Sequence, residues 1–348
     1  MTNNIFSPAM KWLCRNIKYF KPVYCIDKYG NEAPGEQSQS VLTELALVCR
    51  AVKKSGIAEC PIETGELLKI IYHSYNDPRY CRFPPDIAPQ AFIGQLYIWG
   101  ILTELGFDTR ISRDYFADFI CSGDILISNQ VPFRKFELLY LLIKNGFFDD
   151  PGIIRDLYER TFLHLFLSSD DDSFNIINDG DWYDITHTIF YLTDFGAKPA
   201  REYLSGGEIQ SAKKLCVFGA EFALDKMNPD IACELIVSYL FLNDGKQDED
   251  LYKILNLWKK AKSFLHGSGC MPDAGMPPEI IDYMYENNLS EELFNRCYHP
   301  TLVAVMAAAA VELKGDYFNE DHCADYAAQA DCAGLNAEAA RRAEPSKY

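Results

Sequence analysis

The chain has 348 residues, of which 48% are hydrophobic and 14% aromatic. Such a chain can bury a large core, which excludes a largely disordered protein. Its 50 acidic and 33 basic residues give a formal net charge of -17. This charge repels nucleic-acid phosphates and anionic lipid head groups, so neither nucleic acid nor a membrane surface is an expected partner.

The N-terminal segment lacks the basic stretch, the apolar stretch and the small-residue cleavage site of a secretory signal. No apolar run approaches the ~18 residues of a membrane-spanning helix. The twelve cysteines occur singly, without a CxxC pair. Scattered cysteines in a long chain without a signal sequence indicate free thiols in a reducing compartment. The sequence therefore predicts a cytoplasmic protein.

Apolar residues recur at helical spacing along the chain, as in segments 42–52 and 138–143, whereas the alternation typical of strands is nearly absent. Proline suits the first turn of a helix, where no amide proton is needed. Five helix starts are predicted on this basis, at Ser7-Pro8, Ala88-Pro89, Asp150-Pro151, Asn228-Pro229 and His299-Pro300.

The expected helix ends recur at nearly regular intervals. Glycine, and next to it asparagine, is the usual left-handed residue after a helix. Such residues follow helical segments at Gly56, Gly106, Gly146, Gly196, Gly245 and Asn288. Spacings of about 40 to 50 residues indicate repeated helix pairs.

An all-α fold of about six helix hairpins is therefore predicted, in one domain over residues 1–317. We expect the hairpins to close into an (α/α)6 toroid with inner and outer helices, rather than to form an open α-solenoid. Segments 91–102 and 302–311 favour the toroid because they are apolar nearly all round, as burial on two sides requires. Residues 318–348 are predicted to be a weakly packed helical or disordered tail.

The segment 178–196 is the main candidate for chemistry. On a helix, Asp184, His187, Tyr191 and Asp194 would form one narrow polar stripe, within about 80° of each other. Histidine, aspartate and tyrosine bind metals or move protons, so His187, Tyr191 and Asp194 are the predicted catalytic residues. The alternative is an ordinary amphipathic helix whose polar face is solvated.

A metal site is predicted from two short motifs. Asp184 and His187, one helical turn apart, can bind one cation from the same side. Cys297 and His299 are the best candidates for the remaining ligands, and the four together suit zinc, or iron if the thiolate is left out. The alternative is that Cys297 fills the core and His299 makes hydrogen bonds at a helix start. The fingerprints of nucleotide-binding proteins are absent, so no nucleotide cofactor is expected.

The run HTIFYLTDFG at 187–196, with Tyr298, His299 and Thr301 later, resembles an uncharacterised bacterial family found among natural-product biosynthesis genes. The resemblance implies a tailoring role in specialised metabolism without naming a reaction. The architecture is also similar to lanthionine cyclases and protein prenyltransferases, which hold zinc with Asp, Cys and His. Cys297 and His299 are separated by one residue here, whereas the cyclases have adjacent ligands. That likeness is therefore one of architecture only.

These observations together predict a tailoring enzyme, with zinc or iron as its expected cofactor, that acts in a central cavity on a small-molecule or peptide intermediate. The alternative is a non-catalytic helical repeat that binds a peptide or protein along a concave surface. The lack of an established catalytic fingerprint favours this alternative.

Overall fold

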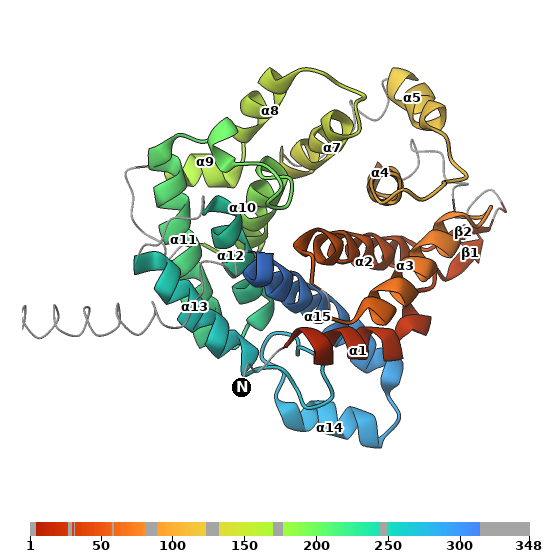
Figure 1. The fold of residues 1–348 in the computed structure, drawn as a ribbon, viewed down its shortest axis with the longest axis vertical. Coiled ribbons are helices and arrows are strands. Elements are labelled where there is room, and N and C mark those ends of the chain that lie inside the picture. The colour runs from red at the N-terminus through yellow and green to blue at the C-terminus, as the bar shows by residue number, and fades with distance from the viewer. Residues whose placement is uncertain are drawn as a thin grey trace, which may run out of the picture.

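The protein is all-α, as the sequence predicts, and Figure 1 shows the fold. The computed structural model describes residues 5–26, 30, 32–57, 59–80, 89–122, 132–169, 177–243 and 249–313. Two sequence-based predictions, the helix end at Gly245 and the tail 318–348, lie outside these residues.

Six helices, called the central helices below, contact one another in a closed cycle. They are α2 (Glu36–Ser55), α4 (Pro89–Glu104), α7 (Pro132–Lys144), α10 (Asp179–Leu192), α12 (Pro229–Leu242) and α15 (Ser290–Leu313). Each packs against the next in this order, and α15 packs against α2. In Figure 1 these helices surround the middle of the molecule.

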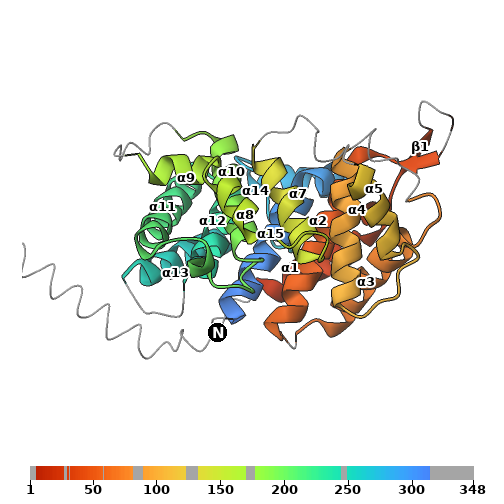
Figure 2. The same ribbon diagram turned by 90° about the horizontal axis from the view of Figure 1, so that it is seen from above.

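The other helices cover the central helices from outside. They are α1 (Phe6–Arg15), α3 (Pro61–Tyr75), α5 (Arg113–Ser122), α8 (Pro151–Tyr158), α9 (Phe162–Leu167), α11 (Gly206–Asp225) and α13 (Glu249–Lys262). Helix α3 packs on α2 and α4, α8 on α7, α9 on α10, and both α11 and α13 on α12. Figure 2 shows α3 and α5 at one side of the molecule, with α9, α11 and α13 at the other.

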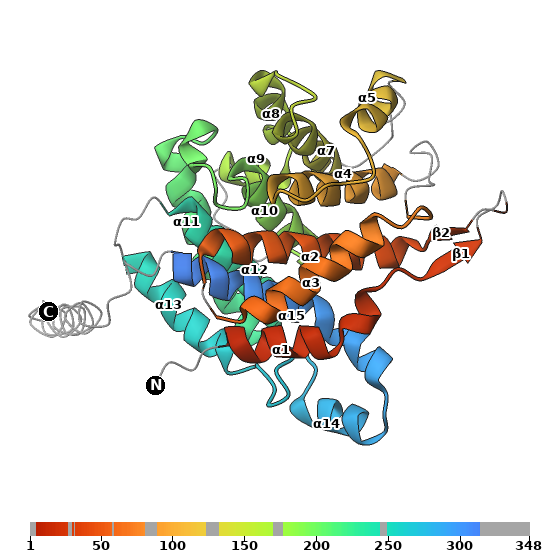
Figure 3. The ribbon, with the colours of Figure 1, turned by 45° about the vertical axis from the view of Figure 1, so that its right-hand side comes forward.

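A β-hairpin, helix α14 and two 3-10 helices complete the described fold. A β-hairpin of β1 (Tyr24–Ile26) and β2 (Glu32–Pro34) pairs antiparallel, with Cys25 opposite Ala33. It projects from one edge in Figure 3, and α14 (Pro278–Glu286) lies at the lower edge. The 3-10 helices η1 (Ile17–Phe20) and η3 (Ala200–Glu202) are the remaining elements. The sequence pattern did not predict the hairpin, because its strands are only three residues long.

The predicted helix ends within the described residues have the expected left-handed backbone. Gly56, Gly106, Gly146 and Gly196 have φ values of 70 to 80°, and Asn288 has φ 57°. Segments 91–102 and 302–311 are buried at every position except Val311, which is half-buried, so their predicted burial on two sides holds up to residue 310. All fourteen residues of α12 are buried as well.

The predicted helix start at His299-Pro300 is wrong, because Pro300 lies inside α15, which begins at Ser290. Proline in a helix removes one backbone hydrogen bond and costs about 3 kcal/mol. Around Pro300, burial of 300–310 offsets this cost. The Thr301 hydroxyl also donates a hydrogen bond to the Cys297 carbonyl. The proline signal identified a position on a helix but not its first turn.

The described cysteines are free thiols, as predicted. No helix within the described residues has the length and hydropathy needed to cross a membrane.

Candidate functional site

A cavity of about 260 Å³ lies between the central helices, and each of these helices contributes to its wall. One polar residue from each helix in chain order is Glu44, Tyr97, Glu137, His187, Glu234 and His299. Apolar side chains such as Val303 complete the lining. The cavity is therefore an apolar space with a few converging titratable groups, which is the usual composition of a ligand site.

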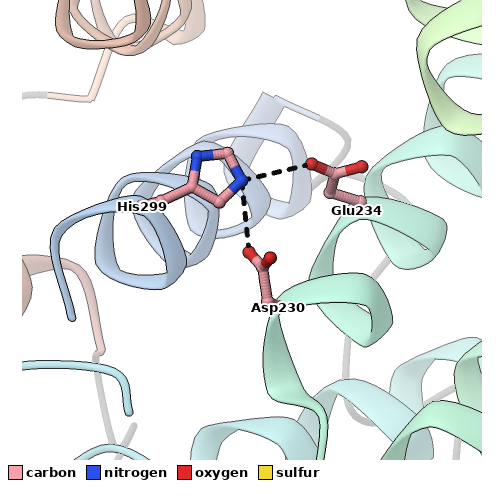
Figure 4. Close-up of side chains that lie close together, drawn as sticks. All are labelled: Asp230, Glu234 and His299. Carbon is pink, nitrogen blue, oxygen red and sulfur yellow. Dashed lines mark ion pairs between the residues drawn. The ribbon is translucent and has the colours of Figure 1, made fainter. Parts of the chain in front are cut away.

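Glu234 and His299 of the cavity wall converge with Asp230, whose side chain does not line the cavity. Figure 4 shows the three side chains. His299 Nε2 lies 3.5 Å from Asp230 Oδ1 and 3.6 Å from Glu234 Oε1. One ligand atom from each of the three residues lies within 4.8 Å of the other two. A metal ion can be held by three such atoms, so this group is the candidate metal site of the described residues.

The sequence of α12 explains why the two carboxylates face the same way. Asn228 caps the helix by accepting a hydrogen bond from the Ile231 amide, and Pro229 occupies the first turn. Asp230 and Glu234 follow one helical turn apart, so they share a face. Because the whole helix is buried, both carboxylates point into protein rather than into solvent, and α15 supplies His299 opposite them.

A second layer of hydrogen bonds orients each of the three residues. The Glu44 carboxylate accepts a hydrogen bond from His299 Nδ1 at 2.9 Å. The Tyr183 hydroxyl donates to Asp230 Oδ2 at 2.7 Å, and the Thr186 hydroxyl donates to Glu234 Oε2 at 2.6 Å. Since a carboxylate only accepts, His299 carries a proton on Nδ1, which directs Nε2 towards the two remaining carboxylate oxygens.

The pKa values of Asp230, Glu234 and His299 depend on one another, because the three groups lie close together. Burial raises the pKa of Asp230 to about 6, although the nearby His299 partly opposes this shift. Burial would lower the pKa of His299, but Asp230 and Glu44 outweigh it and raise that pKa well above its ordinary value. Burial would raise the pKa of Glu234, but His187 and His299 outweigh it and lower that pKa. His299 is thus protonated at neutral pH unless a cation takes its place.

One atom of the cluster lacks a hydrogen-bond partner. Asp230 Oδ1 is buried and accepts no hydrogen bond, while its side chain is only 8% exposed. A buried carboxylate oxygen without a hydrogen bond is costly. The carboxylates Glu44, Asp230 and Glu234 outnumber the single cation His299, so a divalent cation would compensate the excess negative charge.

His187 lines the same cavity, and 29% of its side chain is exposed. Its Nδ1 donates to the Tyr183 carbonyl at 2.8 Å. The same atom lies 3.9 Å from Glu234 Oε2. With the proton on Nδ1, the Nε2 of the neutral ring can accept a proton from a bound molecule.

We expect His187→Ala to abolish function while leaving folding nearly intact. The side chain is partly exposed, and its Nδ1 bond lies within one helix. Water can fill the space that it leaves, so the free energy of unfolding should fall by about 1 kcal/mol or less. Thermal melts of the two proteins test this. A melting temperature lower by about 4 °C or more, which corresponds to about 3 kcal/mol in a chain of 348 residues, would show a structural role instead.

A second prediction concerns pH. Asp230 has an ordinary pKa of 3.8 and a folded pKa of about 6. The folded protein thus binds this proton more tightly than the unfolded chain does. As the pH rises from about 4 to above 6, the free energy of unfolding therefore falls, because the folded protein must then hold a buried charged carboxylate. Asp230→Asn should therefore stabilise the metal-free protein by about 1 to 3 kcal/mol at pH 8, and by less at pH 4. Urea unfolding at both pH values measures this. A variant that is less stable than wild type at pH 8 would contradict it.

A second polar group, on α7 and α10, lines the same cavity. The Tyr191 hydroxyl donates to Glu137 Oε1 at 3.0 Å, and Arg134 pairs with Glu137 Oε2 at 2.7 Å. All three residues line the cavity. Tyr191 is therefore a wall residue of the predicted site, bonded to a carboxylate that the sequence did not single out.

The structure brings His187, His299 and Tyr191 to one cavity. Of the four predicted metal ligands, however, only His299 belongs to the ligand group, and Asp184, His187 and Cys297 do not. Asp184 Oδ1 accepts from the Phe162 amide at 3.1 Å and so caps α9. Cys297 is fully buried, and its thiol interacts with Cys270. Positions 297 and 299 point about 200° apart on a helix, so they cannot share one site. Cys297 is thus a core residue, as the alternative interpretation held.

Asp194 does not share the stripe with His187, because α10 ends at Leu192. Its backbone is left-handed, with φ 46°. Arg50 Nη2, the Tyr140 hydroxyl and Lys144 Nζ donate to its carboxylate at 3.0, 2.6 and 2.5 Å. Asp194 is therefore the centre of a buried ion cluster and does not face the cavity of about 260 Å³.

Sequence reasoning missed Glu44, Asp230 and Glu234. One signal was present, because Asp230 and Glu234 stand four residues apart in a segment, PDIACELIVSYLFL, that is otherwise almost entirely apolar. Carboxylates on a helix buried on all sides need partners or a metal. No comparable signal marked Glu44. This residue reaches His299 only because α2 packs against α15.

Comparison with known proteins gives a family but no activity. Neither the curated proteins nor the solved structures contain a match to this chain. Residues 6–309, which include every residue of the cavity wall, match the family model described as a domain of unknown function, DUF6895. The chain therefore belongs to the DUF6895 family.

Proposed function

We propose that the protein is a metal-dependent enzyme built on a closed (α/α)6 toroid, with its active site in the central cavity. The closed cycle of contacts among the six central helices supports the toroid. An open solenoid would leave its first and last helices apart, whereas α15 packs against α2 here.

The metal site that we propose consists of Asp230, Glu234 and His299. The observation that carries it is the convergence of their three ligand atoms, with the opposite atom of each side chain held by Tyr183, Thr186 or Glu44. Such outer hydrogen bonds are typical of metal sites, where they orient the ligands. Two carboxylates and one imidazole suit a divalent transition metal, zinc or iron. When bound, the ion would supply Lewis-acid chemistry at the cavity wall.

The other cavity residues receive separate roles. Glu44 holds the His299 ring so that Nε2 faces the site. His187, partly exposed beside Glu234, moves a proton to or from the bound molecule. Arg134 and Tyr191 are held by Glu137 in the cavity wall, where they can contact polar groups of a substrate. The reaction class is thus metal-assisted proton transfer on a small molecule.

The substrate that we propose is a small-molecule or peptide intermediate, because a cavity of about 260 Å³ cannot enclose a folded partner. A role in natural-product tailoring stays a prediction from the sequence resemblance. The alternative function, a peptide-binding helical repeat, needs no metal, so metal binding separates the two.

The test is the metal content of full-length protein purified without a metal-affinity step. We expect about one equivalent of zinc or iron, or stoichiometric uptake when a metal-free sample is titrated. Asp184→Asn, which alters a carboxylate bonded to α9, is the matched control and should keep full uptake. Less than about a tenth of an equivalent, with no uptake on titration, would contradict the proposal.

A further inference from the structure

A second cavity lies next to the first and shares part of its wall. It measures about 240 Å³. Leu47, Phe195 and Met306 line both cavities. Each cavity alone is smaller than the ~300 Å³ at the lower end of ordinary ligand sites, whereas the two together fall within that range.

The second cavity is apolar in character. Its further lining includes Ala51, Phe241, Ala309 and Leu313. Two cations, Arg50 and Lys54, also border it, but both are paired with Glu104. Paired side chains of this kind offer their aliphatic stems rather than free charge to a ligand.

The residue between the cavities is held in an unusual conformation. Phe195 and the preceding Asp194 both have left-handed backbone, with φ 54° and 46°. A bulky residue rarely adopts this conformation, and strained residues of this kind cluster at functional sites. The hydrogen bonds from Arg50, Tyr140 and Lys144 to Asp194 hold the turn in place.

From these observations we infer that the substrate carries an unbranched apolar tail. The tail passes between Leu47, Phe195 and Met306 into the second cavity. This inference rests on the proposed function for the polar head, which lies beside Glu234 and His299. The buried ion cluster around Asp194 thus positions Phe195 in the neck of one elongated binding site. The substrate class is amphipathic, with a metal-binding polar head and an alkyl or acyl chain.

The test uses full-length, metal-free protein and n-alkylammonium ions from butyl to decyl, measured by isothermal titration calorimetry. The ammonium head suits the acidic cluster of Glu44, Asp230 and Glu234 in the absence of a metal. We expect the affinity to rise by about three- to fourfold for each added methylene. The same affinity for butyl and decyl ions would overturn the inference.

Variants locate the tail. Ala51→Leu and Ala309→Leu fill the second cavity, so they should weaken decylammonium binding at least tenfold and leave butylammonium binding unchanged. Ala117→Leu, at a half-buried position of α5 that lines neither cavity, is the matched control. If Ala309→Leu fails to fold, Phe195→Trp is the substitute, because it narrows the passage between the two cavities. It should likewise weaken binding of decylammonium more than binding of butylammonium. Filling variants that bind like wild type would overturn the inference.

Failure of the metal proposal gives a different result. Chain-length dependence is measured without metal, whereas metal uptake is measured without an alkyl probe. If affinity depends on alkyl chain length but no metal is taken up, the tail site is supported and the metal site is refuted. If metal is taken up but affinity does not depend on alkyl chain length, the metal site is supported and the tail site is refuted.

Discussion

Glu234→Gln is expected to weaken binding of zinc or iron by more than about a hundredfold. Loss of an outer hydrogen bond alone costs about 10- to 100-fold in metal affinity, and this change removes a ligand charge itself. Glutamine retains the size of the side chain and can still accept the hydrogen bond from Thr186, so the fold should be kept. Metal titration of the purified variant, followed by calorimetry, measures the change.

Glu137→Gln is the matched control for this variant. Glu137 is also buried and lines the same cavity, but its carboxylate is bonded to Tyr191 and Arg134 and does not belong to the ligand group. We expect its metal affinity to stay within a few fold of wild type. Equal losses in the two variants would mean that the general charge of the cavity, rather than the three-residue site, attracts the ion.

Asp194→Ala is expected to produce the largest loss of stability, about 3 to 5 kcal/mol, because it leaves two buried cations, Arg50 and Lys144, with Glu104 as their one remaining carboxylate among the described residues. The side chains of Arg50 and Lys144 are only 3% and 17% exposed. Burial would raise the pKa of Asp194, but Lys144 and Arg50 outweigh it and lower that pKa. In a chain of 348 residues the melting temperature should then fall by about 4 to 7 °C.

The control for this prediction is an exposed ion pair of similar length. Asp225 lies 2.7 Å from Lys260, but the two side chains are 65% and 48% exposed. Asp225→Ala should therefore cost less than about 1 kcal/mol. Parallel urea unfolding of both variants measures the difference. A similar small loss in Asp194→Ala would show that the cluster does not lock the turn at 194–196.

The predictable part of the fold depended on local rules. Glycine and asparagine ended helices where the sequence indicated, because the left-handed backbone after a helix disfavours most other residues. Segments that are apolar on every side lie between two layers, as at 91–102. Pro300 misled the same reasoning, because tertiary burial can offset a local penalty.

The candidate site was only partly predictable, for a related reason. His187 and His299 were identified from residue type, and both line the cavity. Spacing along one helix did not show which face packs against a neighbour, so Asp184, which caps α9, was taken for a ligand. The residues that complete the group, Asp230 and Glu234, meet His299 only through the contact of α12 with α15.

The metal site can be tested most directly by anomalous diffraction from crystals of the metal-loaded protein, collected on both sides of the metal absorption edge. The account predicts one anomalous peak at about 2.0 to 2.2 Å from Nε2 of His299 and from a carboxylate oxygen of both Asp230 and Glu234. No peak within about 3 Å of these atoms, or a peak elsewhere in the protein, would contradict it.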